Sequence, residues 1–204
     1  MSSRPIGPDS PLLLASASPR RRELLALARI PYEVIEQNAH EGLLEGEVAG
    51  AYVLRVTRAK LASAATLLSG PDRARGAVIL AADTSVVLEG RVLGKPGSDE
   101  EAAGMLRALS GRAHDVMSGF ALGEPQGGTL LVERLVLTRV VFRTLTEQEI
   151  EAYVRTGEGR DKAGAYAIQG GASAMVERIE GSATNVVGLP TSELVVELRR
   201  LGLL

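Results

Sequence analysis

Short apolar runs alternate along the chain with longer segments in which apolar residues recur at the spacing of an α-helix. In residues 12–30 an apolar strand leads into a helical pattern, and "PYEVIEQ" at 31–37 again has the character of a strand. Residues 49–68 carry apolar side chains at helical spacing over several turns. This alternation predicts an α/β architecture, in which helices pack on a sheet.

The next predicted strand contains polar residues. Residues 76–96, "GAVILAADTSVVLEGRVLGKP", begin as a buried strand, and we expect a polar break at Asp83 and Thr84 that leaves Asp83 at or near the strand end. A hairpin turn is expected near Glu89 and Gly90. A carboxylate in this position is costly unless it is paired, binds a metal or faces a cleft. The alternative is a turn in which Asp83 bonds its own backbone.

The middle of the chain predicts one capped helix and two strands. Ser98 and Glu101 have the spacing of a capping box at the start of residues 98–109, which carry apolar side chains at helical spacing. Strands are expected at 116–122 and 130–142, with the glycine-rich turn "GEPQGG" between them.

Two further helices complete the pattern. Thr146 and Glu149 form a second predicted capping box, and Gly157 is expected to end that helix. The last helix is expected over residues 190–201, where apolar residues again recur at helical spacing.

The chain shows no sign of division into separate units. The two segments that resemble linkers, residues 69–76 and 124–128, are short enough to be loops. A length of 204 residues is sufficient for a sizeable core, and no internal repeat is present. We therefore predict a single domain over residues 1–204.

Composition and charge restrict the classes of function. Hydrophobic residues make up 45% of the chain and charged residues 24%, as in ordinary globular proteins. The 23 basic and 25 acidic residues give a net charge of −2, so any cationic site is local and the molecule is no general nucleic-acid binder. The absence of cysteine and the presence of only His40 and His114 exclude disulfides, thiol catalysis and the usual Cys/His zinc sites. A hard cation bound by oxygen ligands remains open.

Membrane and nucleic-acid partners are not expected. The first residues, "MSSRPIGPDSP", lack the apolar core of a signal peptide, and no run approaches the roughly 20 apolar residues that span a bilayer. We therefore expect a cytoplasmic protein. Two phenylalanines, four tyrosines and no tryptophan are too few for a platform that stacks bases.

Three consecutive arginines stand at the start of the first predicted helix, where the helix dipole disfavours positive charge. Ser18 fits the N-cap and Pro19 the first helical position, and Arg20, Arg21 and Arg22 follow. Serine hydroxyls, free backbone N–H groups and guanidinium groups together form a good phosphate site. The alternative is a solvent-exposed basic turn, and this segment alone does not decide between them.

Two other segments carry residues suited to a ligand. Lys95 lies between Gly94 and Pro96, where a rigid backbone could aim its ammonium at a phosphate, and the alternative is an ordinary surface lysine. In residues 157–172 small residues allow the backbone to approach a ligand, and Gln169 offers a donor and an acceptor to a nucleobase edge. The alternative for this segment is a glycine-rich turn that leads into a strand.

The common nucleotide and hydrolase motifs are absent. The chain has neither the P-loop pattern G-x-x-x-x-G-K-[ST] nor the Rossmann pattern G-x-G-x-x-G between a strand and a helix. A Ser-His-Asp hydrolase that used His114 would lack the G-x-S-x-G turn that holds the nucleophile.

Five ordered motifs nevertheless carry a family resemblance. They are "LASASPRRREL", "AADTSVVLEGRVLGKP", "LSGRAHDVMSG", "DKAGAYAIQG" and "NVVGLP", and together they resemble the Maf-like nucleoside triphosphate pyrophosphatases over residues 12–201. The resemblance implies hydrolysis of the α–β phosphoanhydride of a nucleoside triphosphate, with a divalent metal cation, Mg²⁺ or Mn²⁺. It also implies an elongated mixed β-sheet flanked by helices, two lobes around a deep cleft, and a homodimer.

The same resemblance assigns roles to residues that match the family's motifs. Asp83, Lys95 and Glu41 are the expected catalytic residues, and Asp83 and Glu41 are the expected metal ligands. The expected substrate-binding residues are Ser16, Ser18, Arg20, Arg21, Lys60 and Gln169. One departure is His40, which precedes Glu41 where many members have another acid or a hydrophobic residue.

Within the family, "SPRR" with "DKAGAYAIQG" resembles the subgroup that acts on dTTP and UTP. Uracil and thymine present one N–H between two carbonyls, an edge that a glutamine amide and backbone groups can recognise. The family has also been linked to inhibition of septum formation. A nucleotide-binding regulator of cell division without turnover is therefore the alternative function.

Overall fold

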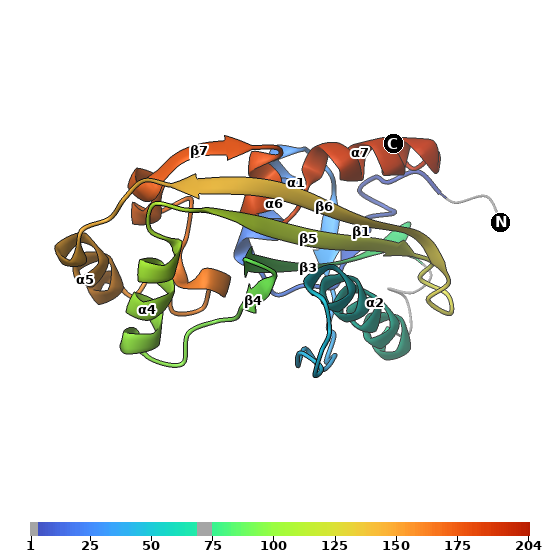
Figure 1. Ribbon diagram of the computed structural model, residues 1–204. Coiled ribbons are helices and arrows are strands. Elements are labelled where there is room, and N and C mark those ends of the chain that lie inside the picture. The colour runs from blue at the N-terminus through green and yellow to red at the C-terminus, as the bar shows by residue number, and fades with distance from the viewer. Residues whose placement is uncertain (1–3, 69–74) are drawn as a thin grey trace.

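The computed structural model describes residues 4–68 and 75–204, and its strands form one mixed β-sheet that runs along the molecule (Figure 1). The strands are β1 (Leu12–Leu14), β2 (Tyr32–Val34), β3 (Val78–Leu88), β4 (Arg91–Leu93), β5 (Ala113–Gly123), β6 (Leu130–Phe142) and β7 (Val176–Glu180). Their order is β2-β1-β3-β5-β6-β7, and β4 pairs with β3 outside this path. β1 is parallel to β2 and β3, whereas the other pairs are antiparallel. The predicted mixed α/β fold is confirmed.

Helices cover both faces and one end of the sheet (Figure 1). They are α1 (Pro19–Leu27), α2 (Ala49–Leu67), α4 (Asp99–Leu109), α5 (Glu147–Thr156), α6 (Ala183–Val187) and α7 (Thr191–Arg200), with the 3₁₀ turns η1 (Ala163–Ala165) and η2 (Gly171–Met175). No helix in the described residues is both long and apolar enough to cross a membrane.

Side-chain alternation along the strands assigns each helix its face. Leu12, Leu14 and Leu80 pack with buried leucines of α1 and α7. Leu13 and Ile79 point the other way and pack against α2. Because both faces of β1 and β3 are covered, these strands are apolar on both sides, as the continuous apolar runs in the sequence indicated.

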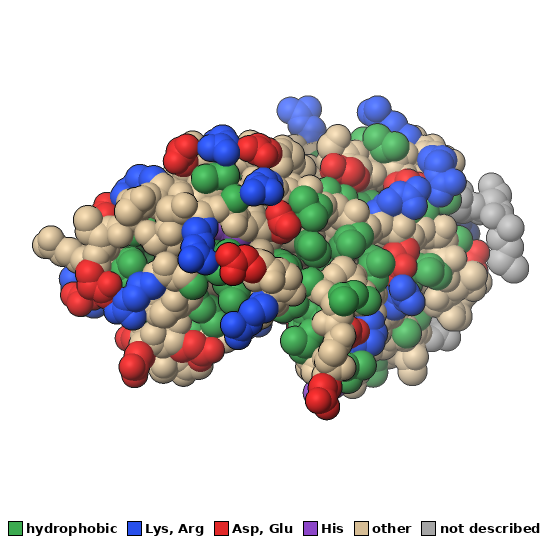
Figure 2. Space-filling view, viewed as in Figure 1, with side chains coloured by type: hydrophobic (Ala, Val, Ile, Leu, Met, Phe, Trp, Pro, Cys, Tyr) green, Lys and Arg blue, Asp and Glu red, His purple; other side chains and the backbone are tan. Residues whose placement is uncertain are grey.

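A separate core lies at the end of the sheet covered by α4 and α5. Leu106 and Leu109 of α4 and Ile150 and Tyr153 of α5 pack there against Phe142 of β6. The apolar core is thus divided between two lobes joined by the sheet, and Figure 2 shows a notch between them.

The predicted break in β3 at Asp83 and Thr84 is wrong. Both residues continue the ladder, in which they face Gly119 and Ser118 of β5. Backbone pairing continues through polar residues because strand side chains point away from the ladder. The carboxylate of Asp83 is instead paired in the middle of the strand with a lysine from α2.

The capping predictions differ between α4 and α5. Thr146 and Glu149 form the complete reciprocal box at the start of α5. At α4 the hydroxyl of Ser98 accepts from the N–H of Glu101, but the carboxylate of Glu101 accepts from the N–H of Gly97. The box of Ser98 and Glu101 is therefore only half formed, because the glutamate bonds the residue before the N-cap.

The predicted turns are confirmed at two sites. Glu89 and Gly90 connect β3 to β4 with φ values of 50° and 80°, the positive values that a tight hairpin of this kind requires. Gly157 ends α5 in the left-handed conformation with φ of 73°.

Element boundaries account for the other differences. The strand predicted at 31–37 ends at Val34, and the one predicted at 116–122 extends three residues earlier as β5. The sequence pattern did not predict the short helix α6. The loop predicted at 69–76 falls mostly on residues outside the described ranges, whereas the turn at 124–128 is present.

Candidate active site

The cleft lies where one edge of β3 has no strand beside it. β1 pairs with this edge as far as Leu80, and β4 joins the same edge only at Val86. Residues 83–85 therefore have no strand partner on that side among the described residues. A cleft of about 990 Å³ occupies this gap between the lobes (Figure 2), a size typical of ligand sites.

All nine residues predicted to act in catalysis or binding line this cleft. They come from the start of α1, the loop before α2, α2 itself, β3, the segment after β4 and the turn after η1. These residues are Ser16, Ser18, Arg20, Arg21, Glu41, Lys60, Asp83, Lys95 and Gln169. Segments far apart in the sequence thus converge on one concave surface.

Lys60 of α2 holds Asp83 and Glu41 together. Its Nζ lies 2.8 Å from Oδ1 of Asp83 and 2.9 Å from Oε1 of Glu41. The side chains of Lys60 and Asp83 are almost fully buried, whereas that of Glu41 is 44% exposed. The charged Arg21 also interacts electrostatically with both carboxylates, so Lys60 and Arg21 together balance the charge of Asp83 and Glu41.

The donor set here fits a hard divalent cation. Asp83 and Glu41 offer the carboxylate oxygens that such ions prefer, and both already meet at one ammonium. Within the described ranges, no cluster of three or more His, Cys, Asp or Glu side chains could hold a metal. The site therefore fits an ion that completes its shell with phosphate and water, as Mg²⁺ commonly does.

Arg21 is buried, and each nitrogen of its guanidinium donates to the protein. Its Nε donates to the carbonyl of Gly188 at 2.9 Å. Its Nη1 and Nη2 donate to the hydroxyls of Ser16, at 2.9 Å, and Thr84, at 3.3 Å. Burial lowers the pKa of Arg21, although an arginine stays charged at neutral pH. This side chain joins α1, β3 and the segment before α7, and a phosphate would have to share donors that are already in use.

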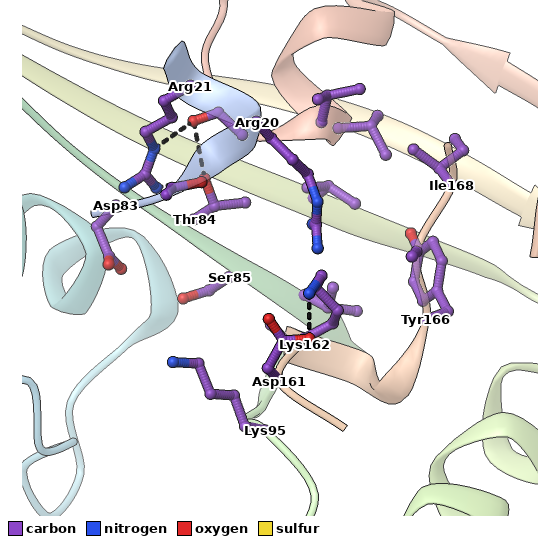
Figure 3. Close-up of a pocket in the computed structure, with 18 of the residues that line it drawn as sticks. Arg20, Arg21, Asp83, Thr84, Ser85, Lys95, Asp161, Lys162, Tyr166 and Ile168 are labelled. Carbon is purple, nitrogen blue, oxygen red and sulfur yellow. Dashed lines mark hydrogen bonds and ion pairs between the residues drawn. The ribbon is translucent and has the colours of Figure 1, made fainter. Parts of the chain in front are cut away.

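Arg20 and Lys95 are the cations left available to a ligand. Both point into the cleft (Figure 3), and neither donates a hydrogen bond or forms an ion pair within the described part of the chain. Burial lowers the pKa of Arg20 and the nearby Asp161 opposes that shift. Ser18 occupies the predicted N-cap of α1, but its side chain makes no capping bond. Its hydroxyl and the first N–H groups of the helix thus remain available.

Every lysine of this chain lines the cleft. The sequence contains three, Lys60, Lys95 and Lys162, and arginine provides the other basic side chains. Lys162 forms an ion pair with Asp161, and its side chain is only 17% exposed. A compact ammonium and a planar guanidinium are not interchangeable at a binding site. Because all three lysines line the cleft, Lys162 is a candidate binding residue that the predicted set omitted.

Ser85 and Glu158 are among the other polar residues of the cleft wall that the predicted set omitted. Ser85 lies two positions after Asp83 on β3, is buried and faces the cleft (Figure 3). Strand alternation could have identified it from the sequence, because residues two apart share a face. Glu158 lines the cleft from the glycine-rich segment, and no pattern in that segment distinguishes it from a surface glutamate.

His114 lies in the core and does not line the cleft. It is 3% exposed, its Nε2 is 2.9 Å from Oη of Tyr166, and its ring meets that of Phe142 edge to face at 5.0 Å. Burial lowers its pKa to about 4. A Ser-His-Asp site built on this histidine would have no access to a substrate.

Acidification from pH 7 to pH 5 is expected to remove roughly 2 kcal/mol of the unfolding free energy through His114 alone. Burial lowers the folded pKa to about 4 from a value of 6.5, so in this window the unfolded chain binds the proton and the folded chain does not. His114→Gln abolishes that contribution. We expect the difference in unfolding free energy between wild type and His114→Gln, measured with urea, to narrow as the pH falls. A difference that stays constant with pH would contradict a lowered pKa of His114.

Comparisons with known proteins agree with the sequence motifs. A family model described as Maf-like protein matches residues 11–201. A curated relative from Geotalea uraniireducens, named dTTP/UTP pyrophosphatase, is 48% identical over 95% of this chain and 96% of its own. One of the same name from Myxococcus xanthus is 50% identical over 94% of this chain and 93% of its own. A solved HAM1 protein from Coxiella burnetii has a TM-score of 0.48 at 16% identity, with 94% of this chain and 99% of that chain covered.

Proposed function

This chain belongs to the Maf-like family, and on that premise we propose that it is a nucleoside triphosphate pyrophosphatase acting on dTTP and UTP. The reaction hydrolyses the α–β phosphoanhydride and yields a nucleoside monophosphate and pyrophosphate. The observation that carries the proposal is the convergence of all nine predicted residues on one cleft. Relatives at 48% and 50% identity that bear the name dTTP/UTP pyrophosphatase support the substrate class.

The triphosphate binds along the wall formed by α1 and the segment after β4. Arg20 and Lys95 break no hydrogen bond or ion pair when they bind phosphate oxygens, because they form none among the described residues. The hydroxyl of Ser18 and the first N–H groups of α1 add neutral donors and the positive end of the helix dipole. Arg21 holds Ser16 in place on the same wall.

Hydrolysis takes place beside Asp83. Its carboxylate accepts a proton from the attacking water, whose oxygen bonds to the α-phosphorus while the bond to the β-phosphate oxygen breaks. Cationic side chains stabilise the charge that develops on the departing pyrophosphate. A divalent cation held by Asp83 and Glu41, Mg²⁺ or Mn²⁺, would supply charge neutralisation and a polarised water. Lys60 holds the two carboxylates beside each other through its ion pairs with both.

Gln169 reads the base. It lies on an exposed turn that lines the cleft, and its amide offers both a donor and an acceptor. Uracil and thymine present an N–H between two carbonyls, which such an amide complements.

Pyrophosphate release from a panel of canonical and modified nucleoside triphosphates, with Mg²⁺, tests the proposal. We expect release from dTTP and UTP, with other nucleotides slower by about tenfold or more, because unpaired polar groups penalise the wrong base. Preference for another nucleotide would retain the reaction and refute the substrate. Nucleotide binding without any release would favour the regulator of cell division instead.

We also propose a cytoplasmic homodimer. Cells keep their nucleoside triphosphates in the cytoplasm, which supports the location. Val48, Leu135 and Leu137 are large apolar residues at least 39% exposed. A Cβ on Gly50 would lie 3.1 Å from Cδ2 of Leu135, so this part of β6 lies beside the start of α2, where a second copy could bind. Light scattering of the purified protein tests the dimer.

A further inference from the structure

The turn that carries Gln169 is held at both ends by side chains, one from α5 and one from the residue that follows its C-cap. At one end the N–H of Ala167 donates to Oη of Tyr153 at 2.9 Å. At the other, the N–H of Gly171 donates to Oε2 of Glu158 at 2.8 Å. Between them the N–H of Gly170 donates to the carbonyl of Ala167 at 2.9 Å and closes the turn.

The contact with Glu158 brings a carboxylate close to Gly170. A Cβ on Gly170 would lie 2.4 Å from Oε2 of Glu158, so a side chain there would displace the carboxylate from its hydrogen bond with Gly171. The backbone φ of Gly170 is −111°, so the conformation itself does not demand glycine. Glycine at this position therefore leaves room for the carboxylate to reach the turn.

The two supports differ in character. Tyr153 is 6% exposed and belongs to the core that α4 and α5 share, so its hydroxyl is a fixed point. Glu158 is exposed and lines the cleft, where its charged oxygen makes a stronger hydrogen bond than a neutral acceptor. One end of the turn is thus fixed to the core and the other to the cleft wall.

We infer that Tyr153 and Glu158 are positioning residues that hold Gln169 where it can discriminate the edge of a pyrimidine. This inference rests on the proposed function, in which Gln169 reads the base. An amide on an unsupported exposed turn would have to be ordered by each ligand, and it would pair with edges of several shapes. Held in place, it matches one arrangement of donors and acceptors and leaves unpaired groups with others.

Steady-state pyrophosphate release from dTTP and from dATP tests this role in the full-length protein. Glu158→Ala is expected to lower the ratio of kcat/KM for dTTP over dATP about tenfold through a higher KM for dTTP, with kcat within about threefold of wild type. Glu158→Gln keeps an acceptor oxygen and should retain most of the selectivity. Tyr153→Phe keeps the packing and should lower the ratio severalfold.

Two further comparisons distinguish a positioning role from a general loss of function. Gln169→Ala should lower the same ratio, and the double variant Glu158→Ala/Gln169→Ala should fall no further, because both changes act through one amide. Glu151→Ala is the matched control: Glu151 lies on the exposed side of α5, 3.8 Å from Arg155, and outside the cleft. It should leave both substrates unaffected.

The inference is overturned if Glu158→Ala leaves the ratio unchanged or lowers kcat equally for both nucleotides. It is also overturned if the losses of Glu158→Ala and Gln169→Ala add fully in the double variant. A wild-type protein without preference for dTTP would refute base reading itself, and the inference with it. The measurement on the wild-type protein alone would reveal this failure of the proposed function, before any variant is compared.

Discussion

Replacing Asp83 with asparagine is expected to lower pyrophosphate release from dTTP about 10³-fold, within the range typical for loss of a general base. Asp83 lies 7% exposed in the middle of β3, and its carboxylate is 2.8 Å from Nζ of Lys60. Asparagine has nearly the same shape, but it neither accepts a proton from water nor binds a cation as a carboxylate does.

The fold is expected to survive this change. The backbone of Asp83 pairs with Gly119 in the ladder between β3 and β5, and an asparagine leaves that pairing intact. Lys60 keeps Glu41 as a partner at 2.9 Å, so its ammonium is not left alone. Circular dichroism and thermal unfolding of Asp83→Asn check this point. Asp115→Asn, at an aspartate of the neighbouring strand β5 outside the cleft, is the matched control and should retain activity.

A titration with Mg²⁺ separates the two roles of Asp83. If the carboxylate acts mainly as a metal ligand, Asp83→Asn should recover part of its activity as the Mg²⁺ concentration rises, because the variant binds the ion more weakly. If it acts mainly as a base, the loss should be the same at every concentration. Activity within about tenfold of wild type would remove Asp83 from the mechanism.

Local patterns predicted most elements of the fold because each depends on neighbours in the sequence. The capping box at Thr146, the helix end at Gly157 and the hairpin at Glu89 and Gly90 all follow from residues within a few positions. The break assigned to Asp83 failed because the stabilising partner is Lys60, 23 residues away on another element. A strand tolerates a buried acid once that partner exists, and no local pattern reveals it.

The sequence predicted a set of candidate site residues, but it could not predict the contacts between them. The family motifs identified the residues, and the cleft contains them all. They could not show that Arg21 donates to the carbonyl of Gly188, 167 residues away, and so ties the cleft wall together. Nor could they show that Lys60 bridges Asp83 and Glu41. Such contacts depend on the packing of whole elements, which spacing along the chain does not encode.

Lys95→Ala is expected to lower kcat/KM for dTTP about 10²-fold, equivalent to about 3 kcal/mol of transition-state stabilisation. The side chain is exposed, points into the cleft (Figure 3) and has no hydrogen bond or ion pair within the described residues. The carbonyl of Gly94 accepts from the N–H of Gly164 at 3.1 Å, and Pro96 restricts the other side. The ammonium therefore projects from a rigid backbone, and its removal breaks no hydrogen bond or ion pair among residues 4–68 and 75–204.

Two variants test whether charge in this place is what matters. Lys95→Arg keeps the charge on a longer, planar group and should lose less than Lys95→Ala. Arg91→Ala removes an exposed cation from β4 of the same hairpin, outside the cleft, and should leave kcat/KM within about twofold of wild type. A loss below about threefold in Lys95→Ala would place Lys95 outside the site.

The distribution of lysines allows the same prediction to be checked without kinetics. All three lysines line the cleft, so an anionic lysine reagent such as pyridoxal phosphate, fixed by borohydride, should label side chains at the site. Bound dTTP should protect Lys95, whose ammonium has no hydrogen bond or ion pair in the described ranges, from modification detected by mass spectrometry. Lys60 should react slowly with or without nucleotide, because it is buried and paired with two carboxylates. Labelling of Lys95 that nucleotide does not change would contradict a phosphate contact even if the alanine variant were inactive.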